Sequence, residues 1–132
     1  MNAGRTFSHE EQVLACTRQI SQPGLSAQNR AQFYNSRGNA FRANREYGSA
    51  IADYDEAIRL DPTYTNALNN RGIANRAAGL ADRAVADFTA ALRIDPEMAS
   101  AYGNRGSAYA DRGDIARALS DFTRAVELDP EY

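Results

Sequence analysis

The sequence repeats itself with a period of 34 residues from residue 31 onward. The segments 31–64, 65–98 and 99–132 align without a gap, and residues of the same type stand at the same places in each. The repeated positions hold arginine before glycine, alanine at two places, aspartate before an aromatic residue, and aspartate before proline: Arg37, Arg71 and Arg105; Ala50, Ala84 and Ala118; Ala57, Ala91 and Ala125; Asp53, Asp87 and Asp121; Asp61, Asp95 and Asp129. A period of this length is typical of stacked supersecondary units that bury their apolar faces against their neighbours.

Each unit predicts two helices joined by a short turn. The turn is marked by glycine in two units, which permits the positive φ of a helix end, and each second helix stops before Asp-Pro because proline cannot continue it. Connections of a few residues require consecutive helices to pack antiparallel. The predicted first helices cover about 26–44, 66–78 and 100–112, and the second helices about 47–60, 80–94 and 115–128.

The segment 1–30 precedes the repeats and predicts one more helix, from about residue 8 to 21. Ser8 begins a capping box, and apolar residues then recur at helical spacing as far as Ile20. Cys16 and Ile20 stand where later units have an aromatic and an aliphatic residue. We interpret this helix as a divergent half-repeat that caps the N-terminal end of a single domain.

Charge and residue usage exclude several functions. The net charge is −2, which argues against nucleic acid because its binders usually carry a basic stripe. One cysteine and one histidine exclude an internal disulfide and a histidine-based metal site. We find no nucleophile–base pair and no phosphate loop, so we expect neither an enzyme nor a cofactor.

The chain also lacks a membrane signature. No apolar run approaches the length of a membrane span, and the first residues lack the apolar segment of a secretory signal. We therefore expect a soluble protein without membrane contact, cytoplasmic by default, and a periplasmic or secreted location stays open.

The repeated residues resemble the tetratricopeptide repeat (TPR) family, whose 34-residue pattern combines aromatic residues with glycine, two alanines and proline. The resemblance covers 31–132 completely. One departure is systematic, because arginine precedes each glycine where the family usually has leucine. A second departure is local, because Asn75 replaces the aromatic residue found at Phe41 and Tyr109.

The resemblance implies an all-α fold, an α-solenoid of antiparallel helix pairs with about seven helices in a right-handed superhelix. First helices would line a concave groove, and such proteins usually hold an extended or helical peptide of a partner there. The groove positions that the resemblance implies are Asn35, Asn39, Arg42, Asn69, Asn70, Ile73, Arg76, Asn104 and Asp111.

Asparagine dominates these positions, with Asn70 and Asn104 where long TPR arrays use asparagine ladders. An asparagine amide can donate to and accept from a peptide bond, so a row of them can hold a peptide backbone regardless of its side chains. Each such bond contributes roughly 1 kcal/mol. Useful affinity therefore requires more, such as an acidic partner for Arg42 and Arg76 or an apolar anchor near Ile73.

The resemblance also bears on acidic chaperone tails, which some TPR grooves hold with a clamp of cations and asparagines. Asn39 and Asn70 match that clamp. Asn35, Ser100 and Asn104 stand where cations should be, so we expect such tails to bind poorly.

The repeated arginines Arg37, Arg71 and Arg105 have two interpretations. They could contact a ligand, or each could pair with the aspartate that repeats in step with it. We favour structural pairs, because a partly buried pair fixes the geometry between helices.

The predicted final helix exposes Leu119, Phe122 and Val126 on a face that a next helix would normally cover. Either the sequence is a fragment of a longer array, or this end self-associates as a homodimer. A structural or assembly role is therefore the alternative to peptide binding.

Overall fold

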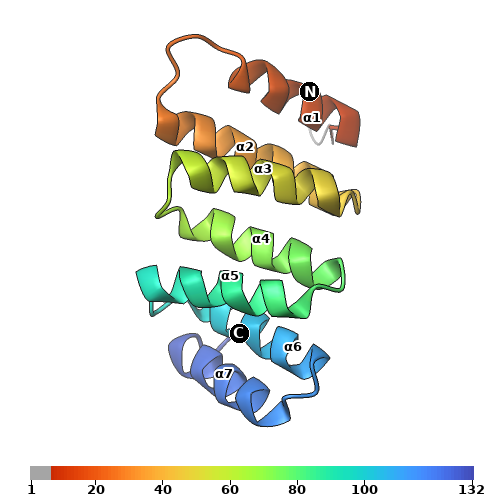
Figure 1. The fold of residues 1–132 in the computed structure, drawn as a ribbon. Helices are drawn as coiled ribbons and strands as arrows, with labels where there is room; N and C mark the ends of the chain where they lie inside the picture. The colour runs from red at the N-terminus through yellow and green to blue at the C-terminus, as the bar shows by residue number, and fades with distance from the viewer. Residues whose placement is uncertain (1–6) are drawn as a thin grey trace, which may run out of the picture. The chain divides into compact units, whose positions relative to one another are not determined.

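The computed structural model describes residues 7–132, and within that range every regular element is an α-helix (Figure 1). The seven helices are α1 (His9–Ile20), α2 (Ala27–Ala43), α3 (Tyr47–Leu60), α4 (Thr65–Ala77), α5 (Ala81–Ile94), α6 (Ala99–Asp111) and α7 (Ile115–Leu128). Their ends lie within one residue of the predicted ends. The all-α helical repeat is therefore confirmed.

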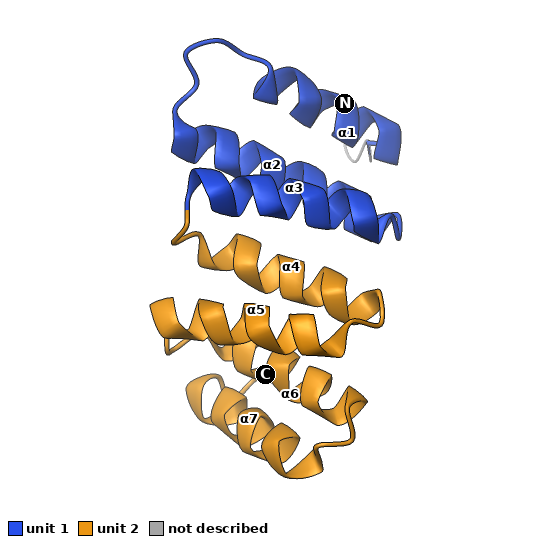
Figure 2. Cartoon of the chain, in the orientation of Figure 1, with its two compact units in different colours: residues 1–61 blue, residues 62–132 orange. Residues whose placement is uncertain are grey.

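The helices form two compact units, which Figure 2 colours separately. Unit 1 is Met1–Asp61 and contains α1, α2 and α3; unit 2 is Pro62–Tyr132 and contains α4 to α7. Within unit 1, α2 packs against both α1 and α3. Within unit 2, each helix packs against the next one, and α4 also contacts α6.

Side-chain caps fix the start of α1 and α2. Ser8 Oγ accepts a hydrogen bond from the Glu11 N–H over 3.2 Å, and Ser26 Oγ accepts one from the Asn29 N–H over 3.1 Å. Each cap satisfies an amide that has no partner inside its own helix. The predicted cap at Ser8 is therefore present.

Glycine–aromatic contacts set the distance between the two helices of each hairpin. A Cβ atom added at Gly72 would lie 2.5 Å from Cε1 of Phe88, which is wholly buried. No side chain fits between them, so the helix axes approach more closely than alanine would allow. The corresponding pairs are Gly38 with Tyr54 and Gly106 with Phe122.

The turns inside the three hairpins share a backbone conformation. Gly79 and Gly113 have φ of 82° and 79°, and Arg45 occupies the same place with φ of 61°. An L-residue with a side chain is strained in this left-handed region. The first hairpin therefore forms although its turn lacks the glycine of the others.

Candidate functional site

The predicted groove residues fall into two groups, one in each unit. Asn35, Asn39 and Arg42 lie on α2 in unit 1. The other six lie on α4 and α6, two first helices that contact each other within unit 2. We call this second group the α4–α6 face: Asn69, Asn70, Ile73, Arg76, Asn104 and Asp111.

Two asparagines meet on the α4–α6 face. Asn104 Nδ2 donates to Asn69 Oδ1 over 3.2 Å. Asn69 is buried and Asn104 is half-buried, so the bond fixes the orientation of an amide that solvent still reaches. Within residues 7–132 the structure gives Asn104 Oδ1 no hydrogen-bond donor. That oxygen can accept a backbone N–H of a bound peptide.

An ion pair lies on the same face. Arg76 Nε donates to Asp111 Oδ2 over 2.7 Å, and Arg76 Nη2 to Asp111 Oδ1 over 3.3 Å. Both side chains are more than two-fifths exposed. An acidic ligand at Arg76 must therefore compete with a carboxylate of the chain itself.

Sequence reasoning placed these four residues on one face but missed their pairing. Both pairs join residues 35 apart, one more than the repeat period. A side chain on α4 therefore bonds to the α6 residue that follows its equivalent in the next repeat. The opposite charges of Arg76 and Asp111, 35 residues apart, were the signal in the sequence that could have revealed this pairing.

The unit 1 candidates are a hydrogen-bonded asparagine, a buried asparagine and a half-buried arginine. Tyr54 donates its hydroxyl proton to Asn39 Oδ1 over 2.6 Å. Burial raises the pKa of Tyr54 to about 12, so this hydroxyl stays protonated at neutral pH. Asn35 is only 7% exposed, and Arg42 is half-buried.

The three repeated arginines are paired with aspartates across their own hairpins. Arg105 Nε and Nη2 donate to Asp121 Oδ2 and Oδ1, each over 2.8 Å, and Asp121 is buried. This hydrogen bonding raises the pKa of Arg105 above its ordinary value. The same bidentate ion pair joins Arg37 to Asp53 and Arg71 to Asp87. The geometry matches the structural interpretation.

A threonine extends this pairing to the preceding helix, which sequence reasoning missed. Arg37 Nη1 donates to Thr17 Oγ1 on α1 over 3.1 Å. Arg105 Nη1 donates to Thr89 Oγ1 on α5 over 3.3 Å. Arg37 and Arg105 therefore each connect a hairpin to the helix before it.

Asn75 is a polar substitute for an aromatic neighbour of the pair. The guanidinium of Arg105 lies 5.8 Å from the ring centre of Tyr109, a cation–π distance. Asn75 has no ring, but its Nδ2 donates to Asp87 Oδ2 over 2.8 Å in the buried interior. The middle repeat thus adds a donor to its carboxylate where the aromatic contact is absent.

The predicted self-association residues are exposed on α7. Leu119 is 61% exposed, Phe122 36% and Val126 48%. Together with Thr123 and Glu127 they line a shallow hollow of about 390 Å³. The three side chains are exposed as expected, and self-association through this stripe stays a prediction.

The described residues contain neither a cluster of metal ligands nor a membrane-spanning helix. Across residues 7–132, no three or more histidine, cysteine, aspartate or glutamate side chains gather so that they could hold a metal ion. No helix in the described part of the chain has both the length and the apolar character to cross a membrane.

Comparison with protein families gives two matches. A model described as "TPR repeat" matches residues 38–79, and one described as "Tetratricopeptide repeat" matches residues 99–132. Among curated proteins no match was found.

Solved structures similar to this chain include TPR domains. The first TPR of Spaghetti (RPAP3), solved with the HSP90 peptide SRMEEVD, is 25% identical with a TM-score of 0.77, covering 82% of this chain and 84% of its own. The Arabidopsis OM64 TPR domain is 27% identical with a TM-score of 0.79, covering 80% and 88%. The Sgt2 TPR domain from Aspergillus fumigatus is 30% identical with a TM-score of 0.74, covering 76% and 66%.

Proposed function

The chain belongs to the tetratricopeptide repeat family, and from this premise we propose that its α4–α6 face binds an extended peptide segment of a partner protein. TPR domains are protein-interaction modules, and the similar Spaghetti domain was solved with a peptide. The chain is a scaffold rather than an enzyme in this proposal.

The observation that carries the proposal is the bond between Asn69 and Asn104. It joins consecutive first helices and leaves a fixed, half-buried amide facing the surface. Such an amide recognises peptide backbone, which every sequence offers, so partner choice comes from the residues around it. Ile73, half-buried on α4, supplies an apolar contact beside it.

The charge of the face sets the class of peptide. Arg76 and Asp111 neutralise each other there, and Asn104 and Ser100 stand where an acidic-tail clamp needs cations. A peptide of low charge binds without breaking this ion pair, whereas an acidic peptide has to displace Asp111 from Arg76. We therefore expect the face to prefer uncharged extended peptides over acidic tails.

The first experiment selects a peptide from a random display library and measures its dissociation constant by calorimetry. The Asn104→Ala variant is expected to bind about tenfold more weakly, because one hydrogen bond of roughly 1 kcal/mol and the order of the site are lost. Asn29→Ala, an exposed asparagine on α2, is the matched control. Equal affinity of wild type and a folded Asn104→Ala protein would remove the proposal.

The second experiment titrates the peptide SRMEEVD and tests the charge argument separately. Wild type is expected to bind it no more tightly than millimolar. Asp111→Ala frees Arg76 and is expected to improve binding of this acidic peptide. Micromolar binding by wild type would contradict the preference for uncharged peptides.

A second candidate function is self-association through α7. The observation that favours it is the exposed stripe of Leu119, Phe122 and Val126. A surface of this kind on an amphipathic helix pairs readily with another apolar face.

A further inference from the structure

Helix α1 is placed on α2 as α5 is placed on α6. In both places an arginine of the first helix donates to a threonine of the preceding helix, Arg37 to Thr17 and Arg105 to Thr89. The sequence separation is 20 residues in the first case and 16 in the second. The chain between the bonded residues is therefore four residues longer in the first case, and residues of α1 and α5 can be matched one by one through the two threonines.

This match identifies the face of α1 that corresponds to the α4-facing side of α5. Cys16 takes the place of Phe88 and Ala15 the place of Asp87. In unit 2, α4 packs on α5, and Phe88 and Asp87 are buried. In unit 1, Cys16 is half-buried and Ala15 exposed, and no helix of the described residues stands where α4 would.

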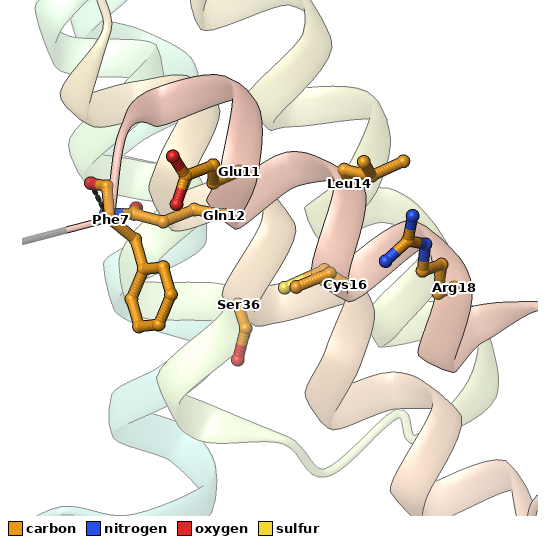
Figure 3. Close-up of a pocket in the computed structure, with 8 residues that line it drawn as sticks. Phe7, Glu11, Gln12, Leu14, Cys16, Arg18 and Ser36 are labelled. Carbon is orange, nitrogen blue, oxygen red and sulfur yellow. Dashed lines mark hydrogen bonds between the residues drawn. The ribbon is translucent and has the colours of Figure 1, made fainter.

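A hollow of about 530 Å³ marks this place, shown in Figure 3. Most of its lining comes from α1, and one residue comes from α2. The lining residues are Phe7, Glu11, Gln12, Leu14, Ala15, Cys16, Arg18 and Ser36. We call this site the α1–α2 hollow.

The residues that replace Phe88 and Asp87 define what could fill the hollow. Gly72 of α4 is small because the ring of Phe88 leaves no room for a Cβ. Cys16 has no ring, so a helix lying here needs a large apolar side chain where α4 has glycine. Ala15 has no carboxylate, so that helix has no use for an arginine at the place of Arg71.

The packing of α4 on α5 gives the direction of the helix, and the charges along the hollow give its complementary residues. Glu11 and Arg18 both line it and lie seven residues apart, about two helical turns. A helix antiparallel to α1, as α4 is to α5, brings its N-terminus to Arg18 and its C-terminus to Glu11. Acidic residues in its first turn and basic residues in its last turn would complement both charges and its own dipole.

We propose that the α1–α2 hollow binds an amphipathic helix of a partner protein, antiparallel to α1, with a large apolar side chain against Cys16. This surface is separate from the α4–α6 face and does not depend on peptide binding there.

The test uses two fluorescein-labelled probe peptides with the sequence of α4 (Thr65–Ala77). Both carry Arg71→Leu, and both carry Asn66→Glu to supply the acidic first turn that α4 lacks. One retains Gly72 and the other carries Gly72→Leu. By fluorescence anisotropy, wild type is expected to bind the Gly72→Leu probe at least tenfold more tightly than the Gly72 probe. The Cys16→Phe variant is expected to reverse this preference, because the ring fills the space and restores a glycine–aromatic contact.

Leu119→Ser on α7 is the control, since it alters an exposed apolar surface outside the hollow and should leave both affinities unchanged. The same probe preference in wild type and Cys16→Phe would overturn the proposal, as would the absence of binding by either probe. A dimer of wild type that Cys16→Phe converts to a monomer would also overturn it, because a second copy would then be the occupant.

Discussion

The guanidinium of Arg105 and the buried carboxylate of Asp121 depend on each other. Both nitrogens of the pair are within 2.8 Å of carboxylate oxygens. Arg105→Leu leaves that carboxylate buried without its cation, so we expect a loss of about 3–5 kcal/mol of unfolding free energy. Chemical denaturation measures this loss.

The double variant Arg105→Leu, Asp121→Leu tests the cause. With both charges removed, most of the lost stability should return, because the cost lies in the unpaired carboxylate rather than in the missing attraction. A double variant as unstable as the sum of its two single variants would contradict this explanation.

Tyr54 should make the free energy of unfolding decrease at alkaline pH. Burial raises its pKa to about 12 in the folded protein, against about 10 for an unfolded chain. Below pH 10 the phenol is neutral in both states, whereas above it the unfolded chain releases the proton first. Stability should therefore fall between about pH 10 and 12, by on the order of 2 kcal/mol.

The test compares wild type with Tyr54→Phe. The denaturation midpoint of each protein is measured between about pH 10 and 12. The variant lacks the ionisable group, so its midpoint should decline less steeply. Parallel profiles for the two proteins would show that Tyr54 does not titrate as its burial requires.

At the scale of the hairpin, alanine substitutions at two glycines should change the stability in opposite directions. Gly72→Ala would place a Cβ 2.5 Å from Phe88, so we expect the α4–α5 hairpin to lose about 1–3 kcal/mol. Gly48 lies in the first turn of α3 with no atom within 4 Å of an added Cβ. Gly48→Ala should therefore stabilise the protein by about 0.5–1 kcal/mol. Thermal unfolding of both variants measures these changes. Melting temperatures that shift in the same direction would contradict the packing argument.

In the turn between α2 and α3, a substitution to glycine rather than from glycine should stabilise the protein. Arg45 has a φ of 61°, where the other hairpins use Gly79 and Gly113. Arg45→Gly removes the strain of a side chain in the left-handed region and should stabilise the protein by about 1 kcal/mol. Arg45→Ala keeps a Cβ and should give little change in the denaturation midpoint. Equal midpoints for the two variants would place the strain elsewhere.

The ends of the elements were predictable because their causes are local. Ser8 and Ser26 cap the helices they precede, and Asp-Pro ends each second helix whatever it packs against. The pairing of Arg105 with Asp121 followed from two residues repeating in step. Periodic sequence therefore encodes contacts inside a hairpin well.

Contacts between successive first helices were harder to predict. The bond from Asn104 to Asn69 depends on a shift of one residue beyond the period, which no single repeat contains. The α1–α2 hollow depends on the size of Cys16 relative to Phe88 and on what covers each. Such features are set by neighbouring elements rather than by local pattern, and the sequence alone did not predict them.

At the scale of the whole molecule, we propose that the exposed apolar surface of α7 mediates association. Ile115, which is also exposed, extends the α7 stripe of Leu119, Phe122 and Val126 to a span of eleven residues, or about 16 Å of helix. Its four apolar members, Ile115, Leu119, Phe122 and Val126, are each at least 36% exposed. A twofold pairing of two such stripes would bury each of them twice, once on either copy.

We therefore predict that the protein dimerises as its concentration rises, measurable as mass by sedimentation equilibrium. Leu119→Ser should raise the dimer dissociation constant tenfold or more, because each buried leucine contributes about 1.5–3 kcal/mol and the dimer contains two. Leu14→Ser alters a leucine of similar exposure on α1 and should leave the constant unchanged. A wild type that stays monomeric at millimolar concentration, or a Leu14→Ser variant as impaired as Leu119→Ser, would mean that the α7 stripe is not the contact.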